Sequence, residues 1–416
     1  MQMQWAIVCF TLFGLTCHTG VADDWPQFLG PDRNGICAET DLIDRFPDDG
    51  PAVVWRAAAG VGMSGVAVSA GSVYTLYQDE QQQYVVAMDE GTGEQKWRTG
   101  IAAAYENAMG NGPRATPTVA GATVFVFTGQ GVLAALSVET GKVQWKVDTL
   151  RDVGAKSAAY GMSSSPLVVG GKVVVHVGSH NGAVVAYDVE SGDRIWNVGN
   201  QPIGYSSPVM MKFGGTKQIV SFIATAVVGI APADGRELWN HAFVTEYDCN
   251  IAVPRQLNDS SLLISSGENH GSAIVKVTES GDAWSVEETW TSFGKGSVLR
   301  SEWQTPVERN GHLFGMDNIG GGGPITNLVC VNIASGKQVW IEKRFGKANL
   351  TLADGKLFIS TMNGELVIVK ATDDGFQETA RAAVLGMTRQ APVIANGQLY
   401  LRDDNEVVCI DIRLTK

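Results

Sequence analysis

Arginine, tyrosine, tryptophan and acidic residues recur just ahead of short apolar segments that begin with proline or an equivalent residue. Guanidinium groups bind anions through several N–H donors, and aromatic faces bind cations and apolar groups. Side chains of these types are typical of a cleft that holds a ligand or a peptide. The candidate ligand-binding residues are Arg114, Tyr160, Tyr205, Asp248, Asn250, Arg300, Glu302, Trp303, Asn349 and Arg389. The alternative interpretation is that pairs such as Arg300 and Glu302 neutralise one another around a water-filled funnel.

Motifs for other kinds of chemistry match poorly. Residues 60–65 fit Gly-x-Gly-x-x-Gly, but strand-like sequence follows where a dinucleotide site needs a helix, so we predict a connector. His176 and His180 lie on either side of a predicted turn, which argues against a shared metal ion. Residues 320–324 are glycine-rich and predict a hairpin loop, since no Lys-Ser/Thr and helix follow. We therefore predict no catalytic residue and no metal ligand.

The elements that must position the candidate residues come from a repeat. The phrase Ala-x-Asp-x-x-Thr-Gly-x-x-x-Trp, or a close variant, fills residues 87–97, 135–145 and 186–196. Looser copies follow, and the tryptophan returns every 43 to 51 residues. The looser copies end at Trp239, Trp290 and Trp340. This period, with strand-like sequence between the tryptophans, predicts a β-propeller whose indoles pack between blades.

Each repeat predicts four antiparallel strands joined by tight turns. The inner strands are expected to open near Val66, Pro117, Pro166, Pro208, Pro254, Pro306, Leu350 and Pro392. The last repeat is one strand short, and residues 51–57 contain an outer-strand phrase with its tryptophan. We predict an all-β, eight-bladed propeller over residues 51–416, closed by this N-terminal strand, which also removes an exposed sheet edge. Deleting residues 51–57 is expected to open the ring.

The first 22 residues differ from the rest. Residues 5–15 form an uncharged apolar run, and small residues at 20–22 precede two acids. The run is too short to span a membrane, so we predict a cleaved signal peptide over residues 1–22. An uncleaved anchor and a lipid anchor at Cys17 are the alternatives. The protein is then expected to be exported, periplasmic or secreted, with no membrane span, and residues 23–50 are expected to form an arm outside the ring.

Composition limits the partners. The chain has 31 Lys and Arg against 43 Asp and Glu, a net charge of −12, which argues against nucleic acid or an anionic membrane surface. A closed ring leaves no edge strand that requires a second copy, so we expect a monomer. Export would place four cysteines in an oxidising compartment, where the sequence leaves pairing and free thiols equally open. These cysteines are Cys37, Cys249, Cys330 and Cys409.

The repeat resembles the tryptophan-docking motif of quinoprotein-like, PQQ-type eight-bladed propellers. Residues 87–97 match it at every fixed position, and residues 186–196 match with Ser191 in place of Thr. Residues 24–35 also resemble the head of exported PQQ-repeat proteins of planctomycete type. The resemblance implies one of two activities. One branch holds pyrroloquinoline quinone (PQQ) and Ca²⁺ and oxidises alcohols or sugars; the other, similar to the assembly factor BamB, binds protein segments and catalyses nothing.

We favour the second branch on the residues present. The chain has no adjacent cysteine pair, no Glu, Asn and Asp set could be assembled for Ca²⁺, and the blades are compact. The predicted function is therefore a non-catalytic binding scaffold without a cofactor. Its partner would be an envelope protein or peptide segment, or a small ligand, at the channel mouth. The alternatives are a PQQ- and Ca²⁺-dependent dehydrogenase and, on weaker grounds, a partner in carbohydrate or polymer processing.

Overall fold

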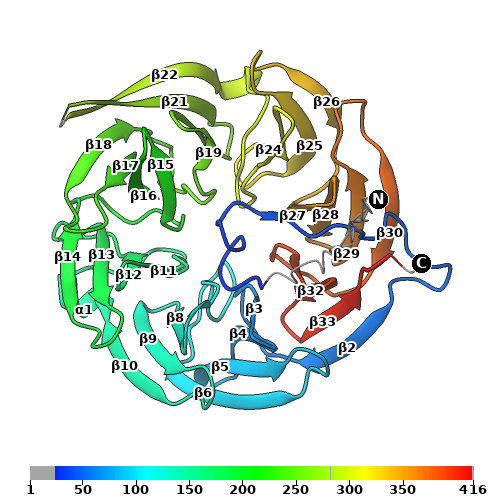
Figure 1. Cartoon of the computed structure of the whole chain (residues 1–416), viewed down its shortest axis with the longest axis horizontal. Coiled ribbons are helices and arrows are strands. Elements are labelled where there is room, and N and C mark those ends of the chain that lie inside the picture. Colours follow the sequence, from blue (N-terminus) through cyan, green and yellow to red (C-terminus); the bar gives the residue numbers. More distant parts are fainter. Residues whose placement is uncertain (1–23, 282, 415–416) are drawn as a thin grey trace, which may run out of the picture.

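The computed structural model describes residues 24–281 and 283–414 as a ring of eight sheets around a central channel (Figure 1). Each blade has four antiparallel strands that run from an inner strand at the channel to an outer strand at the rim. The predicted all-β, eight-bladed propeller is confirmed. The helical elements described are α1 (Thr149–Val153) and the 3-10 turn η1 (Gly294–Gly296). The predicted signal peptide, residues 1–22, lies outside the described residues.

The first four blades follow one another along the chain. Blade 1 contains β3 (Ala67–Ser69), β4 (Ser72–Gln78), β5 (Gln82–Asp89) and β6 (Gln95–Ala103). Blade 2 contains β7 (Thr118–Ala120), β8 (Thr123–Phe127), β9 (Val132–Ser137) and β10 (Val143–Asp148). Blade 3 contains β11 (Leu167–Val169), β12 (Lys172–His176), β13 (Val184–Asp188) and β14 (Arg194–Val198). Blade 4 contains β15 (Val209–Phe213), β16 (Thr216–Phe222), β17 (Ala226–Ile230) and β18 (Glu237–Ala242).

The second half of the ring has the same plan with two additions from the N-terminus. Blade 5 contains β19 (Arg255–Asn258), β20 (Ser261–Ser266), β21 (Gly271–Ser280) and β22 (Ala283–Phe293). Blade 6 contains β23 (Val307–Arg309), β24 (His312–Ile319), β25 (Ile325–Asn332) and β26 (Gln338–Glu342). Blade 7 contains β27 (Ala348–Ala353), β28 (Lys356–Thr361), β29 (Glu365–Lys370) and β30 (Glu378–Ala383), with β1 (Ile36–Cys37) parallel to β27. Blade 8 contains β31 (Val393–Ala395), β32 (Gln398–Arg402), β33 (Glu406–Asp411) and, as its outer strand, β2 (Val53–Ala58).

The repeated phrase explains how neighbouring blades pack. The Trp145 indole Nε1 donates to the carbonyl oxygen of Val189 in the next blade at 2.9 Å. Its ring packs on Gly192, where a Cβ atom would lie 2.7 Å from the ring and the backbone is left-handed. A glycine at this turn therefore makes room for the indole of the preceding blade. The large apolar ring and its single N–H are both satisfied between two blades.

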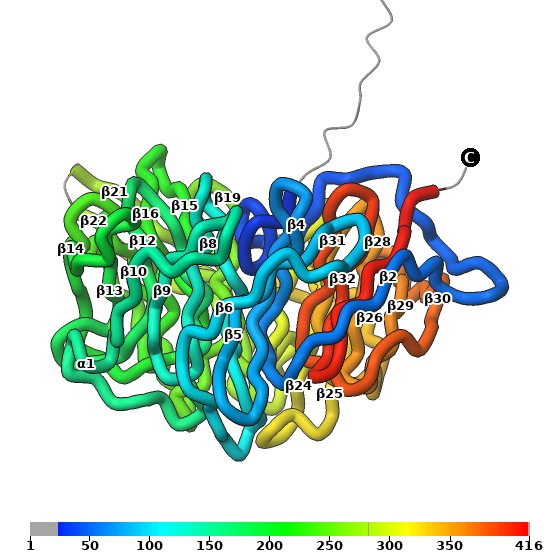
Figure 2. Tube along the Cα trace, turned by 90° about the horizontal axis from the view of Figure 1, so that it is seen from below, coloured from blue at the N-terminus to red at the C-terminus, as the bar shows by residue number. Residues whose placement is uncertain are grey.

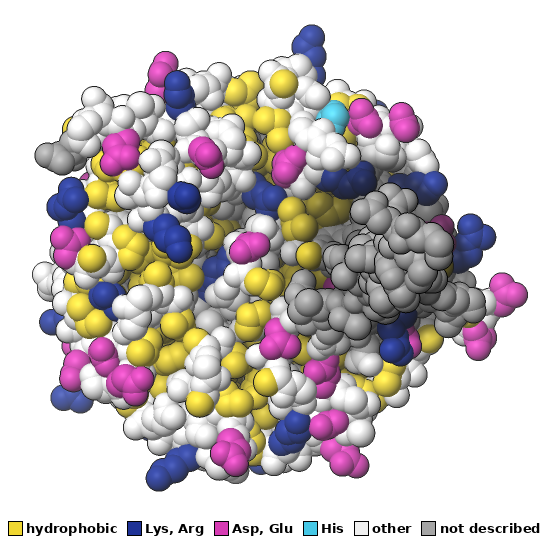
Figure 3. Space-filling view, viewed as in Figure 1, with side chains coloured by type: hydrophobic (Ala, Val, Ile, Leu, Met, Phe, Trp, Pro, Cys, Tyr) yellow, Lys and Arg dark blue, Asp and Glu magenta, His cyan; other side chains and the backbone are white. Residues whose placement is uncertain are grey.

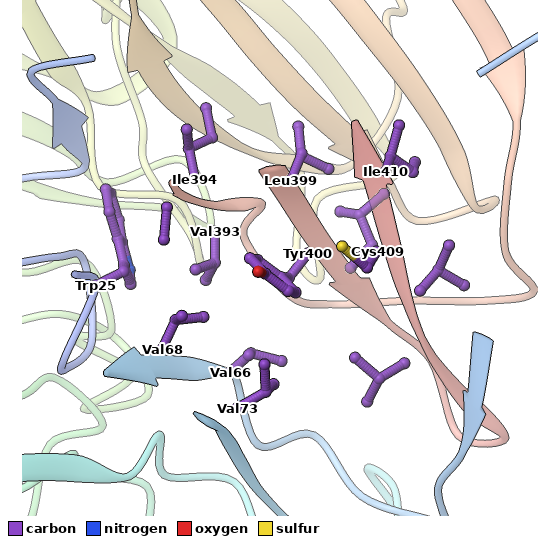
Figure 4. Close-up of a cluster of buried hydrophobic side chains, with 14 of the residues drawn as sticks. Trp25, Val66, Val68, Val73, Val393, Ile394, Leu399, Tyr400, Cys409 and Ile410 are labelled. Carbon is purple, nitrogen blue, oxygen red and sulfur yellow. The ribbon is translucent and has the colours of Figure 1, made fainter. Parts of the chain in front are cut away.

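The ring is closed by the N-terminal strand as predicted. β2 pairs antiparallel with β33, and Trp55 Nε1 donates to the carbonyl oxygen of Glu90 in blade 1 at 2.8 Å. A buried cluster joins blades 8 and 1, with Val68 and Val73 facing Val393 and Tyr400 (Figure 4). Burial of this cluster stabilises the closed ring because opening it would expose the apolar side chains to water.

The two faces of the ring differ. The arm face carries the N-terminal arm, and the C-terminal Leu414 lies beside it, since its N–H donates to the carbonyl oxygen of Asp41. Figure 2 shows this face at the top and the loop between β24 and β25 at the bottom. Figure 3 views the arm face, where charged side chains stand mainly around the rim and a cleft opens beside the arm. The opposite face, formed by the loops that lead into the inner strands, is the mouth face.

Candidate functional site

The first part of the arm runs through the channel and not outside the ring. Trp25 pairs with Val68 of β3, and β1 adds to the inner strand of blade 7, so the chain crosses the channel between them (Figure 1). Arg33 lies inside, with 3% of its surface exposed. For residues 24–37 the predicted position outside the ring is wrong, because the inner strands offer this segment apolar contacts and backbone acceptors that its sequence alone does not reveal.

Arg33 fixes the arm in place. Its guanidinium donates to Gln27 Oε1, Thr118 Oγ1 and the carbonyl oxygens of Ser165, Pro166 and Pro208. These acceptors belong to the arm itself and to the inner ends of blades 2, 3 and 4. Burial lowers the pKa of Arg33 to about 9, and no carboxylate among the described residues forms an ion pair with it. All its N–H groups are therefore used in closing one end of the channel.

A cavity of about 210 Å³ remains on the mouth side of the arm. Its inner end is formed by Phe28 and Leu29 of the arm, and its walls come from the loops that enter the inner strands. Tyr160 and Met109 line it and are 41% and 46% exposed, so the cavity opens at the mouth face. Because the arm blocks the far end, it is a blind cavity and not a through channel.

The structure brings six of the predicted residues together around this cavity. Five of them come from five different inter-blade loops and Asn349 from the start of β27, and they converge because every inner strand begins at the same end of the ring. These residues are Arg114, Tyr160, Tyr205, Trp303, Asn349 and Arg389. The remaining four, Asp248, Asn250, Arg300 and Glu302, do not line the cavity.

Arg114 and Arg389 give the cavity a positive wall. Arg114 donates to the carbonyl oxygens of Tyr160 (2.8 Å), Gly110 (2.6 Å) and Gly112. Its pKa is lowered to about 10, first by burial and also by the nearby positive charge of Arg389. Neither arginine forms an ion pair with a described carboxylate. Two guanidinium groups thus line one cavity, and no Asp or Glu lines it with them.

Arg389 retains unused donors. Its Nη1 contacts Met63 Sδ at 3.1 Å and the carbonyl oxygen of Met109. Its buried Nε has no hydrogen-bond partner among the described residues. Asn349 holds the loop in place, since its Nδ2 donates to the Arg389 carbonyl oxygen at 2.9 Å. A buried N–H without an acceptor is costly, and a ligand oxygen would satisfy it.

Aromatic rings form the rest of the wall. Tyr160 and Tyr205 stack with their centroids 5.5 Å apart, and the Tyr205 hydroxyl accepts the Tyr160 backbone N–H at 3.2 Å. Burial raises the pKa of Tyr205 to about 12, so it stays neutral at physiological pH. The Trp303 ring lies 5.4 Å from Arg389 Cζ and 4.2 Å from Lys347 Nζ, within reach of cation–π attraction.

The opposite side of the mouth is acidic. Cys249 lines the cavity, and its pKa is raised to about 11 by burial and by the negative charges of Glu268, Asp248 and Glu302. The pKa of Glu268 is also raised, by burial first and then by Glu302 and Glu246. Cys249, Cys330 and Cys409 are free thiols. The thiol of Cys249 stays protonated at neutral pH, which removes it as a nucleophile.

The charge pairs differ from the expected Arg300–Glu302 pair. Arg300 instead makes a buried two-point ion pair with Asp317, from Nε to Oδ1 at 2.6 Å and from Nη2 to Oδ2 at 2.8 Å. Glu302 pairs with Lys347 at 2.9 Å. The sequence-adjacent pairing was wrong because the neighbouring strand β24 brings a carboxylate closer. Arg300 is therefore part of the packing, as is Asn250, whose Nδ2 donates to two backbone carbonyls.

Several residues of the cavity were not predicted from the sequence, among them those of the arm and of one connector. Phe28 and Leu29 line the cavity, although the arm contains no repeat that could have placed them there. Met63 and Gln390 line it too. Met63 belongs to residues 60–65, which join β2 to β3 as the predicted connector. Its position between an outer strand and an inner strand was the signal that could have found it.

The residues present do not fit a PQQ-bound calcium ion. Ca²⁺ takes six or more oxygen ligands and relies on carboxylates, but no Asp or Glu lines the cavity. Among the described residues, no group of three or more His, Cys, Asp or Glu is placed to hold a metal. The two arginines would repel a cation placed between them. The lining of the cavity therefore does not suit this cofactor and its calcium ion.

The fold and the cavity define a closed eight-bladed β-propeller with a blind pocket at one mouth. The family model for "Outer membrane protein assembly factor BamB" matches residues 42–160, 81–321 and 325–414. The chain belongs to this family of PQQ-like repeat propellers. Among the described residues, no helix has the length and apolar character needed to cross a membrane.

Known proteins of two kinds are similar to the chain. The BamB of Yersinia pestis is 22% identical over 370 residues, covering 85% of this chain and 76% of that protein. The BamB structure from Moraxella catarrhalis superposes with a TM-score of 0.58 at 15% identity, covering 86% of this chain and 97% of the other. A europium-containing methanol dehydrogenase superposes with a TM-score of 0.66 at 13% identity, covering 93% and 89%. At these identities the structural likeness shows the fold alone.

Proposed function

We propose that this protein is a non-catalytic scaffold that binds a segment of another protein at the mouth of its channel. The observation that carries the proposal is the blind cavity, with its apolar end, its aromatic walls and two arginines that form no ion pair with a described carboxylate. Exposed apolar side chains lie around its opening. Met387 is 56% and Tyr247 53% exposed on that face, beside the cavity residues Met109 and Tyr160. Apolar side chains that gather around a pocket are typical of protein-binding surfaces.

The relatives support the same proposal. The family model and the Yersinia protein are both described as outer membrane protein assembly factors, and an assembly factor acts by binding other proteins. We infer an exported protein that acts as a monomer on an envelope partner. The quinoprotein alternative has relatives of the same fold, yet the cavity lacks the carboxylates that would hold its calcium ion.

The direct test is peptide selection on the full chain, immobilised through its C-terminus so that the mouth face stays free. We expect 12-residue peptides to bind the wild-type protein and to lose binding when Tyr160 is changed to Asp. The matched control is Val339→Asp, an equally exposed position on the outer strand β26. Peptides that bind both variants alike would place the site elsewhere and overturn the proposal.

The second test is a titration with PQQ, with and without Ca²⁺, followed by tryptophan fluorescence. We expect no calcium-dependent binding, because no carboxylate faces the cavity. Saturable binding that requires Ca²⁺ would favour the dehydrogenase, and oxidation of alcohols and sugars would then be assayed.

A further inference from the structure

The shape of the cavity limits what part of a partner can enter it. The volume of the cavity is about 210 Å³. Phe28 and Leu29 close its inner end, so an entering chain cannot continue through the ring. An internal segment would have to turn back inside this space, whereas the last residues of a chain would enter without a turn.

The charge of the cavity selects between the two kinds of chain end. Arg114 and Arg389 both line it, and no Asp or Glu does. The buried Nε of Arg389 has no partner, and no acceptor is present for its Nη2 among the described residues. A carboxylate offers two oxygens that match a guanidinium edge, and charge-assisted hydrogen bonds of this kind are the strong ones. An N-terminal ammonium group would instead be repelled.

The surroundings limit the residues next to that carboxylate. Trp303, Phe28 and Leu29 offer apolar surface at the cavity itself. Around Cys249, on the other side of the mouth, the acids Glu246, Asp248, Glu268 and Glu302 gather, and Lys347 is the one described cation that pairs with any of them. A partner with an apolar last residue and basic residues further back would complement both sides.

We propose, resting on the scaffold function above, that the cavity binds the carboxyl-terminal end of a polypeptide. The terminal carboxylate is bound by Arg389 and Arg114, and the last side chain packs on Trp303 and the arm. Basic residues upstream face the acidic side of the mouth. The protein as a whole carries a charge of −12, which repels anions, so a preference for a free carboxylate must come from the cavity and not from long-range attraction.

The experiment compares two display libraries on the immobilised full chain. In one library random peptides end in a free carboxylate; in the other the same peptides are fused at both ends to the carrier. We expect enrichment from the free-ended library alone, with an apolar last residue. Enrichment from both libraries alike would overturn this inference and leave the scaffold function standing. No enrichment from either would overturn both.

The enriched peptide is then titrated in solution as the free acid and as the C-terminal amide. We expect the acid to bind about 10- to 100-fold more tightly, the range given by hydrogen bonds to charged groups. Arg389→Met should remove this difference, and Arg389→Lys should restore part of it. Arg236→Met, at an exposed arginine in a turn of blade 4, is the matched control and should leave it unchanged. Equal binding of acid and amide would overturn the inference.

A third arm separates a chain end from a small carboxylate. The N-acetyl derivative of the peptide's last residue, as a free acid, carries the same terminal group without the upstream residues. We expect it to bind at least tenfold more weakly than the peptide, because it cannot reach the acidic side of the mouth. Equal affinity would show that the cavity takes small carboxylates, against the polypeptide end proposed here.

Discussion

Two arginines of the same channel show the difference between a side chain that stabilises the fold and one whose donors are free to bind a ligand. Arg33, on the arm, donates to acceptors in three blades and to its own segment. Arg389, at the mouth, has a buried Nε without a partner and a second arginine beside it. Both lack a carboxylate partner, so charge alone does not separate them. The two arginines differ in the number of hydrogen bonds that their guanidinium groups donate.

The tryptophans divide in the same way. Trp145 is buried between blades, with its N–H bonded and a glycine beneath the ring. Trp303 lines the cavity, half-buried, with cations on its face. The aromatic residues of the repeat therefore pack between blades, whereas the loops between repeats carry the aromatic residues that a partner could contact. Substitutions at matched positions test this division.

The largest effect is expected from Trp145→Ala. Removing the indole leaves a cavity between blades 2 and 3 and an unbonded Val189 carbonyl, and such losses cost about 3–5 kcal/mol of the free energy of unfolding. Urea unfolding followed by circular dichroism measures it. Trp303→Ala is the comparison and should cost less than about 1 kcal/mol. Equal losses at the two positions would break the division.

Arg33→Met is expected to follow. Its carbonyl acceptors at Ser165, Pro166 and Pro208 would lose their donor in the channel, and each unsatisfied buried group costs about 1–3 kcal/mol, partly relieved by water. We expect a total loss of about 2–4 kcal/mol. Limited proteolysis should also cut the arm, residues 24–50, sooner than in the wild type. An arm that remained protected would mean that Arg33 does not fix it.

A buried histidine near Arg33 also predicts a pH dependence. His176 is fully buried, and its pKa is lowered to about 3 by burial and by the positive charge of Arg33. The unfolded chain binds a proton near pH 6.5 and the folded protein near pH 3, so this contribution is complete above pH 6.5 and is lost as the pH falls toward 3. The loss is at most about 1.4 kcal/mol per pH unit.

Unfolding measured between pH 7 and pH 4.5 checks this. His176→Gln should reduce the slope over that range, since the amide does not titrate. His180→Gln, in the turn that follows, should leave it unchanged. If both variants keep the wild-type slope, another group causes the dependence.

The sequence predicted the ring because its determinants are local and repeated. The contact of Trp145 with Gly192 joins one copy of the phrase to the next, so the period alone predicts the blade-to-blade packing. The loops before the inner strands must also converge, whatever their detailed path. For that reason Arg114 and Arg389 could be placed at one mouth from their positions ahead of two such strands.

The parts that failed depend on contacts between segments that share no repeat. The arm enters the channel because Arg33 finds hydrogen-bond acceptors in three blades, and no pattern in residues 23–50 records their positions. Arg300 pairs with Asp317 because β24 lies beside the loop of Arg300. This proximity is a tertiary contact that the order of residues does not predict. Phe28 and Leu29 were not predicted at the cavity because the entry of the arm into the channel was not predicted.

The smallest effect is expected from Arg389→Met, and it sharpens the comparison most. Its side chain makes few bonds in the unbound protein, and removing it relieves the repulsion on Arg114. We expect the free energy of unfolding to change by less than about 0.5 kcal/mol, in either direction. Urea unfolding beside Arg33→Met measures the contrast. A loss as large as that of Arg33→Met would show that Arg389 holds the loops together. Both arginines would then be structural, and the unpaired Nε of Arg389 would no longer be evidence for a ligand contact.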